Sequence, residues 1–153
     1  MIALASDHGG LNLKAEIIKL LEERGAEYKD FGTNSAESCD YADYGYPAAL
    51  AVANGECEKA ILICGTGVGM SLVANKIKGI RCVVCSDCFS AVLSRQHNDT
   101  NVLALGERVA GSGLGRLIAE SWLDAIFEGG RHARRIAKIA AIENNGFCPN
   151  GAY

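Results

Sequence analysis

The sequence has little proline, few aromatic residues and no long hydrophobic run. Its 153 residues include two prolines and 7% aromatic residues. No segment approaches the roughly 20 consecutive apolar residues that a membrane-spanning helix needs. The N-terminal apolar run covers only residues 2–5, which is short for a secretory signal. We therefore expect a compact protein of the cytoplasm that does not have a membrane as its partner.

Strong charge of either sign is also missing. The formal net charge is −3 at pH 7, which disfavours nucleic acid or an anionic lipid surface as the main partner. Apolar residues make up 49% of the chain, and a chain of this length and composition can bury the core of one domain. We assign that domain to residues 1–143 and expect a loose C-terminal tail over residues 144–153.

The cysteines do not form a disulfide pattern. Seven are present, and an odd number without a secretory signal indicates free thiols. The spacing of Cys82, Cys85 and Cys88 suggests zinc or an iron–sulfur cluster. However, Cys82 and Cys85 lie in a predicted strand, where residues three apart point to opposite faces. Core packing is the better interpretation, and we expect no bound metal.

Short apolar runs alternate with segments of helical periodicity along the chain. The pattern predicts strands over 2–6, 27–31, 60–64, 81–86 and 101–105. It predicts helices over 13–24, with Asn12 as N-cap, and over 46–54, 70–76, 88–96, 114–127 and 132–144. This alternation indicates an α/β fold, a three-layer α/β/α sandwich around a Rossmann-like five-stranded parallel sheet. We expect the common strand order 2-1-3-4-5.

The rest of the chain is arranged around a glycine-rich turn that follows the third predicted strand. Glycines alternate there with other residues, at Gly65, Gly67 and Gly69. Without Cβ atoms the backbone N–H groups can approach an anion or a developing oxyanion. Cys64 ends the strand beside those donors, in surroundings that stabilise a thiolate, so it is the first candidate for chemistry.

Two other interpretations of this turn are open. It resembles a dinucleotide-binding fingerprint, with Asp87 near the position of the ribose-binding acid, but it follows the third strand and has Met70 at the third glycine position. The glycines can also form a turn without a ligand. A phosphate-binding P-loop is excluded because no Gly-Lys-Ser/Thr follows.

Asp7 and His8 end the first predicted strand. In the expected strand order they are neighbours of Cys64, and ligands of open α/β sheets bind beyond the carboxyl ends of the strands. The two motifs should therefore face one crevice. The alternative is a turn that the Asp7 side chain supports by hydrogen bonds.

His97 is a candidate acid or base, or a histidine stabilised at a helix end. The predicted helix that carries it begins at the carboxyl end of the fourth strand. It ends near the opposite edge of the sheet, where the strands begin, and therefore far from Cys64. Within one subunit His97 is then structural, or it completes the site of a neighbouring subunit. Arg131 and Arg135 lie one helical turn apart and could clamp a phosphate, although a solvated basic face is the commoner use of such residues.

The sequence resembles the type B ribose-5-phosphate isomerases, whose wider family includes galactose-6-phosphate and allose-6-phosphate isomerases. The resemblance covers about residues 1–143. It is carried by six separated motifs: Ser6-Asp7-His8-Gly9-Gly10, Asp40-Tyr41, Ile63-Cys64-Gly65-Thr66-Gly67-Val68-Gly69, Ser94-Arg95-Gln96-His97-Asn98-Asp99, Gly106-Glu107-Arg108-Val109 and Glu128-Gly129-Gly130-Arg131-His132.

The resemblance implies an aldose–ketose isomerase that needs no metal or other cofactor and proceeds through a cis-enediolate. Cys64 would be the base that moves the proton between C1 and C2, and His97 the acid that opens the furanose ring. The implied substrate-binding residues are Asp7, His8, Gly65, Thr66, Gly67, Val68, Gly69, Asn98, Arg108, Arg131 and Arg135.

The resemblance also implies active sites shared between subunits, in a homodimer or a dimer of dimers, with the His97 segment crossing over. Ribose 5-phosphate and ribulose 5-phosphate are the expected substrate pair. A sister hypothesis keeps the mechanism with allose 6-phosphate or galactose 6-phosphate. From another class, the chain could be a sugar-phosphate-binding regulatory module without turnover.

Overall fold

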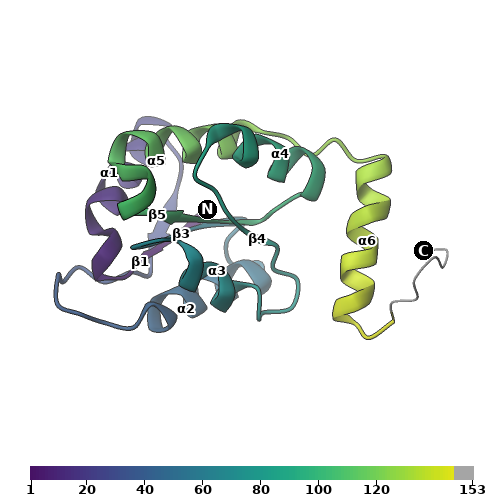
Figure 1. The fold of residues 1–153 in the computed structure, drawn as a ribbon, viewed down its shortest axis with the longest axis horizontal. Coiled ribbons are helices and arrows are strands. Elements are labelled where there is room, and N and C mark those ends of the chain that lie inside the picture. Colours follow the sequence, from purple (N-terminus) through teal and green to yellow (C-terminus); the bar gives the residue numbers. More distant parts are fainter. Residues whose placement is uncertain (147–153) are drawn as a thin grey trace.

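A five-stranded parallel sheet forms the middle layer of the fold, with helices on both faces (Figure 1). The computed structural model describes residues 1–146. The strands are β1 (Ile2–Ser6), β2 (Tyr28–Asp30), β3 (Lys59–Cys64), β4 (Cys82–Val84) and β5 (Val102–Gly106). The helices are α1 (Leu11–Glu23), α2 (Tyr41–Ala53), α3 (Val68–Ala74), α4 (Cys88–Asn98), α5 (Glu107–Asp124) and α6 (Arg131–Glu143), with a 3-10 turn η1 (His8–Gly10) before α1. The predicted three-layer α/β class is confirmed, whereas the predicted tail falls mostly on residues 147–153, outside the described part.

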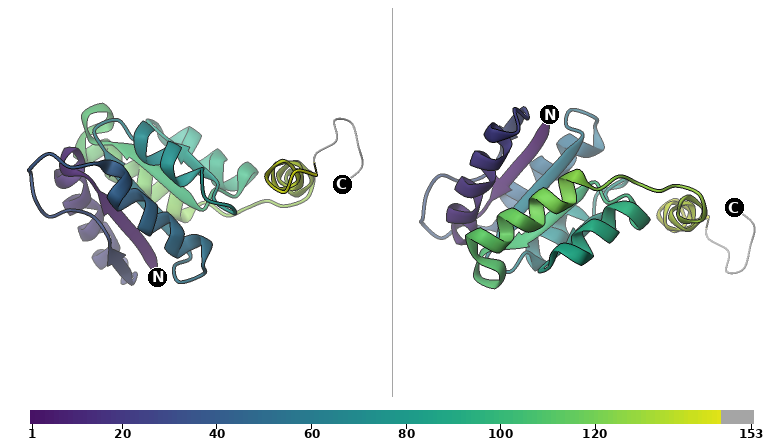
Figure 2. Two further views of the ribbon diagram at one scale, coloured as in Figure 1. Left: turned by 90° about the horizontal axis from the view of Figure 1, so that it is seen from below. Right: turned by 90° about the horizontal axis from the view of Figure 1, so that it is seen from above.

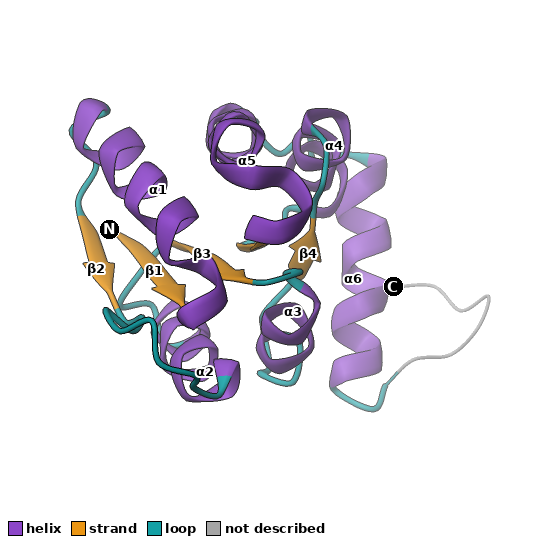
Figure 3. Cartoon of the chain, turned by 60° about the vertical axis from the view of Figure 1, so that its left-hand side comes forward, coloured by secondary structure: helices purple, strands orange, loops and turns teal. Residues whose placement is uncertain are grey.

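The two faces of the sheet bury side chains of different size. Leucines and isoleucines of β1, β3 and β5, such as Leu4 and Ile61, pack with Trp122 under α1, α4 and α5. The opposite face is largely alanine and packs against α2 and α3 (Figure 3). The small alanine side chains allow α2 to approach the sheet closely. On the other face, each fully buried leucine or isoleucine contributes roughly 1.5–3 kcal/mol to the free energy of folding.

The predicted strand order was wrong for the last two strands, which are exchanged. The observed order is β2-β1-β3-β5-β4, so β5 and not β4 is the neighbour of β3. Every residue of β5 is buried, whereas Val84 in the three-residue β4 is 38% exposed. A strand that is buried on both faces belongs inside the sheet and a short, half-exposed one at its edge. The exchange places Gly106 directly opposite Cys64.

The helices begin or end within two or three residues of their predicted bounds, except that two begin much earlier, and one predicted cap was wrong. The second helix begins at Tyr41 and continues through Pro47, and α5 begins at Glu107 because two helical segments join across a kink at Gly111, where φ is +68°. Asn12 lies inside α1, not at its start. The preceding η1 turn leads directly into α1 and is capped by Asp7 instead.

Helix α6 lies beside the sheet and not on either face. Figure 2 shows it end-on, joined to the body by one extended segment. Within the described chain it contacts α4, and Ile139 and Ile142 on it are about half exposed. Among the helices of residues 1–146, none has both the length and the apolar character that crossing a membrane requires.

Candidate active site

The turn after β1 is built by the side chain of Asp7. Its Oδ1 accepts a hydrogen bond of 2.8 Å from Gly9 N, and its own N–H donates to Ile63 O at 3.2 Å. The first bond shapes η1, and the second ties the turn to β3. A Cβ on Gly9 would lie 3.2 Å from Gly65 N. The first and third strand ends therefore lie together, as the sequence predicted.

The thiol of Cys64 lies against the glycine loop. Cys64 is 4% exposed, and its Sγ accepts a hydrogen bond of 3.1 Å from Gly67 N. The φ of Gly67 is +81°, a left-handed conformation that brings this N–H back toward the sulfur. A Cβ at Gly67 would also approach Leu105 C to 3.0 Å. The hydrogen bond holds the sulfur against the glycine loop.

Two large side chains cover the glycine loop. The guanidinium of Arg108 lies over Gly65, where a Cβ would come within 3.4 Å of its Nε, and Arg108 N donates to Gly65 O at 3.1 Å. The ring of Tyr41 lies over Gly69, where a Cβ would be 2.8 Å from Cζ. Tyr41 is not among the site residues predicted from the sequence. The one sequence feature that could have indicated its role was the Asp40-Tyr41 motif.

His8 faces the loop that precedes α2. Its Nδ1 lies 3.2 Å from Cys39 N, which donates to it, and 3.7 Å from Cys39 Sγ. Because Nδ1 accepts a main-chain N–H, the proton of the neutral ring is on Nε2. His8 therefore presents an N–H donor on its other edge.

His97 and Asn98 lie at the opposite end of the sheet. They close α4, just before β5 begins at Val102, which is in register with Ala60. Cys64 is four residues further along β3, about 13 Å at 3.3 Å per residue. The candidate residues of one chain therefore fall into two candidate half-sites, with Asp7, His8, the loop and Arg108 in the first and His97 and Asn98 in the second.

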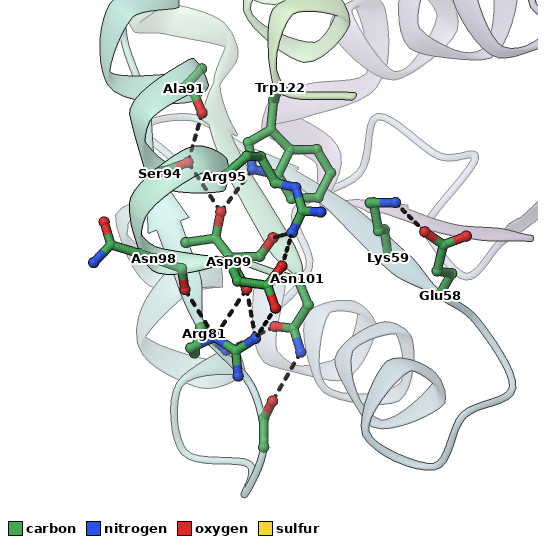
Figure 4. Close-up of polar contacts among 12 residues, drawn as sticks. Glu58, Lys59, Arg81, Ala91, Ser94, Arg95, Asn98, Asp99, Asn101 and Trp122 are labelled. Carbon is green, nitrogen blue, oxygen red and sulfur yellow. Dashed lines mark hydrogen bonds and ion pairs between the residues drawn. The ribbon is translucent and has the colours of Figure 1, made fainter. Parts of the chain in front are cut away.

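A network of buried polar groups fixes the end of α4 (Figure 4). Arg95 donates to Asp99 Oδ1 at 2.7 Å and to Thr100 O at 2.6 Å. Thr100 Oγ1 accepts from Trp122 Nε1 at 2.9 Å. Arg81 also binds the Asp99 carboxylate, at 3.0 Å. These bonds attach the turn that follows His97 to Arg81, which precedes β4, and to α5.

Arg131 and Arg135 both lie on α6, close to His97 in the fold. The ring of His97 is stacked on that of His132, the second residue of α6, with centroids 4.1 Å apart and planes 4° apart. Both arginines are exposed, one helical turn apart. The second candidate half-site thus combines an imidazole with two exposed cationic side chains.

One group in the described part of the chain has metal-ligand chemistry, namely His97, Glu128 and His132, whose ligand atoms lie within 4.8 Å of one another. The stacked rings lie in two separate, nearly parallel planes, and an imidazole lone pair lies in the plane of its ring, so one cation cannot lie in both ring planes. The rings would have to separate before a metal could bind them both.

The cysteine run does not offer a metal site either. Cys82 packs on the α2–α3 face of the sheet and Cys85 on the other, as their spacing in a strand predicts. Burial raises the pKa of Cys82 to about 12 and that of Cys85 to about 11. Both thiols are therefore protonated at neutral pH in the protein without a metal, and their side chains lie on opposite faces of the sheet, where one ion cannot bind both.

Comparison with known proteins places this arrangement in one family. The family model for Ribose/Galactose Isomerase matches residues 2–139. The chain is 58% identical over 142 residues to Ribose-5-phosphate isomerase B of Escherichia coli, covering 93% of this chain and 95% of that protein. It is 40% identical over 144 residues to D-erythrulose-4-phosphate isomerase of Pectobacterium atrosepticum, covering 94% and 95%. The solved structure of Ribose-5-Phosphate Isomerase B from Clostridium thermocellum superimposes with a TM-score of 0.92 at 54% identity, covering 94% and 97%.

Proposed function

The chain belongs to the Ribose/Galactose Isomerase family, and from that premise we propose that it interconverts ribose 5-phosphate and ribulose 5-phosphate. The protein is an isomerase, and the observation that carries the choice of substrate is the 58% identity, over 93% of this chain, to Ribose-5-phosphate isomerase B of Escherichia coli. A hexose 6-phosphate with the same mechanism is the second candidate, since the family description names galactose as well as ribose.

In the proposed mechanism Cys64 is the base. After the ring opens, the thiolate removes the proton from C2 of the aldose, the electron pair of that C–H bond forms the C1–C2 double bond, and the carbonyl electron pair moves onto O1 to give the enediolate. The proton of the O2 hydroxyl passes to O1, the C2–O2 bond becomes the carbonyl, and the protonated sulfur returns its proton to C1, which yields the ketose and regenerates the thiolate. The hydrogen bond from Gly67 N to the sulfur supports this role, because it holds the sulfur beside the loop whose N–H groups face the substrate in this proposal.

The enediolate oxygen is assigned to the N–H groups of the glycine loop. Gly67 N is bonded to Cys64 Sγ, and Val68 N lies 3.4 Å from Thr66 Oγ1. The enediolate oxygen would therefore accept hydrogen bonds from other main-chain N–H groups between Gly65 and Gly69. One well-placed donor of this kind lowers the barrier by roughly 3 kcal/mol, so the loop contributes on the scale of the base itself.

The second half-site is proposed to come from a second copy of the chain. His97 and Cys64 lie at opposite ends of one sheet, and a ring-opening acid must reach the same sugar as the base. In a dimer with twofold symmetry each contact occurs twice, so Cys64 of each copy would meet His97 of the partner and form two complete sites.

Exposed apolar residues support this homodimer. Phe89 is 74% exposed, and Leu72 and Val68 of α3 are more than half exposed beside the glycine loop. The edge strand β4 has a free side, and a cavity of about 300 Å³ lies between it, α4 and Ile139 of α6. Apolar surface of this kind is typical of a subunit interface.

The substrate assignment is tested by kcat/KM of the purified protein, measured with ribose 5-phosphate and with allose 6-phosphate in the presence of EDTA. We expect the pentose phosphate to be preferred at least tenfold, since one extra carbon changes transition-state binding by about 1–3 kcal/mol. Preference for allose 6-phosphate would select the second candidate. Binding of both sugars without turnover would favour a regulatory module.

The phosphate is assigned to Arg108 of one copy and to Arg131 and Arg135 of the other. Arg135→Ala should raise KM for ribose 5-phosphate by about 10–100-fold, the effect of losing one charge-assisted hydrogen bond. The matched control is Arg134→Ala, which removes the adjacent exposed guanidinium from another side of α6. Kinetics with free ribose complete the test, and an equal loss with ribose and ribose 5-phosphate would contradict a phosphate clamp.

A further inference from the structure

We propose that His132 is a positioning residue, whose buried ring sets the orientation of the His97 imidazole for ring opening. The proposal rests on the function proposed above, because it deepens the role given there to His97. His132 itself would not touch the sugar. It would act through the stack that joins the first turn of α6 to the last turn of α4.

The stack restrains His97 directly. The two rings are separated by 4.1 Å between centroids and are parallel within 4°. The side chain of His132 is 4% exposed and that of His97 is 35% exposed. A histidine ring on a helix end can otherwise rotate broadly about χ2. With His132 fixed beneath it, such rotation would drive the edge of the His97 ring into a buried neighbour.

The connection before α6 holds the second ring in place. Glu128 N donates to Gln96 O at 3.0 Å, which ties the connection to the end of α4. Glu128 Oε2 lies 3.5 Å from His132 Nε2 and 4.0 Å from His97 Nε2. Gly129 and Gly130 then adopt positive φ values of 65° and 54°. The sharp turn that they form places the ring of His132 against the ring of His97.

The charges around His132 favour a neutral ring. Burial, then the nearby His97, then Arg131 and Arg135 lower its pKa, and Glu128 opposes them. Its Nδ1 is buried and has no hydrogen-bond partner among the described residues, while Arg131 Nε donates to Nε2 at 3.4 Å. A neutral, buried ring serves as a flat platform. It is poorly placed to exchange protons with the substrate.

The far end of α6 has its own attachment. Both carboxylate oxygens of Glu143 accept from Gly79 N at 3.0 Å. Loss of the stack should therefore leave α6 attached to the body. This separates two effects, since disorder of His97 lowers kcat, whereas displacement of α6 moves Arg131 and Arg135 and raises KM.

The test compares His132→Phe with His132→Leu in the full-length protein. Both replacements are apolar and fill the buried position, but only phenylalanine presents a flat ring to His97. For ribose 5-phosphate we expect the Phe variant to keep kcat within about threefold of wild type, and the Leu variant to lose about tenfold or more, within the range of general acid catalysis. KM should change less than threefold in both.

Imidazole ¹H–¹⁵N correlation spectra without substrate give a readout that does not depend on turnover. The His97 ring signals should be narrow in wild type and in the Phe variant, and broadened in the Leu variant. If wild type does not turn over ribose 5-phosphate, the proposed function fails while these spectra still report on the stack.

Several outcomes would overturn the positioning role. A Leu variant with wild-type kcat would do so, as would a Leu variant that raises KM alone, because the role of His132 would then be only to hold α6. If the Leu variant does not fold, the Phe variant decides alone: kcat within threefold supports the stack, and a larger loss in a folded Phe variant contradicts it.

Discussion

Replacing Cys64 by alanine is expected to lower kcat for ribose 5-phosphate by about 10²–10⁴-fold, the usual contribution of a positioned general base. The sugar and its phosphate are bound by other residues in this proposal, so the substrate Kd should change less than about threefold. Steady-state kinetics and calorimetry measure the two quantities. The pattern of a lost kcat with a retained Kd is what removal of a proton carrier produces.

The control for Cys64→Ala is Cys57→Ala. Cys57 is also a buried thiol, 3% exposed, but it precedes β3 at the end of the sheet away from the glycine loop. Its replacement should leave kcat within twofold. If the Cys64→Ala protein keeps wild-type activity, the base must be another group, and the assignment of the proton transfer to this sulfur is wrong.

Two inactive variants should restore activity to each other. We consider a heterodimer of one Cys64→Ala chain and one His97→Asn chain, isolated by two different affinity tags. One of its two sites then takes Cys64 from the second chain and His97 from the first, and is complete. Its activity should be about half that of wild type, because the other site lacks both groups. Each homodimeric variant should be nearly inactive.

The reciprocal heterodimer makes the result decisive. It pairs a wild-type chain with a chain that carries both Cys64→Ala and His97→Asn. Shared sites leave no complete site in this species, and its activity should fall to the background level. Sites contained within single chains predict the opposite, half activity here and none in the first heterodimer. Light scattering of both preparations confirms that they are dimers.

The layers of the fold were predictable because the signals are local. Strands β1, β3, β4 and β5 are short, mainly apolar runs, and the glycine-rich turn follows β3 directly. The position of Cys64 at the end of β3, beside main-chain donors, could be inferred from adjacent residues alone. The same holds for the opposite faces of Cys82 and Cys85, which follow from the two-residue period of a strand.

Several features that depend on longer-range contacts were predicted incorrectly or not at all. The order of β4 and β5 is set by which strand can be buried on both faces, and this depends on how the helices cover the sheet. Tyr41 was missed as a site residue because its contact with Gly69 joins segments that lie 28 positions apart in the numbering. The start of α5 was missed because Gly111 interrupts the helical periodicity there.

The sequence by itself determined which chemical groups are available, namely a thiol at a strand end, a glycine loop, a histidine at a helix end and a pair of arginines. The connectivity read from the sequence also placed Asp7 and His8 beside Cys64 and His97 far from it, as observed. Only the tertiary structure decided which further side chains meet these groups: it stacks His97 on His132 and places Arg108 and Tyr41 over the glycine loop. The physical reason is that local periodicity fixes which face a side chain occupies, whereas the packing of whole elements fixes which distant side chains meet.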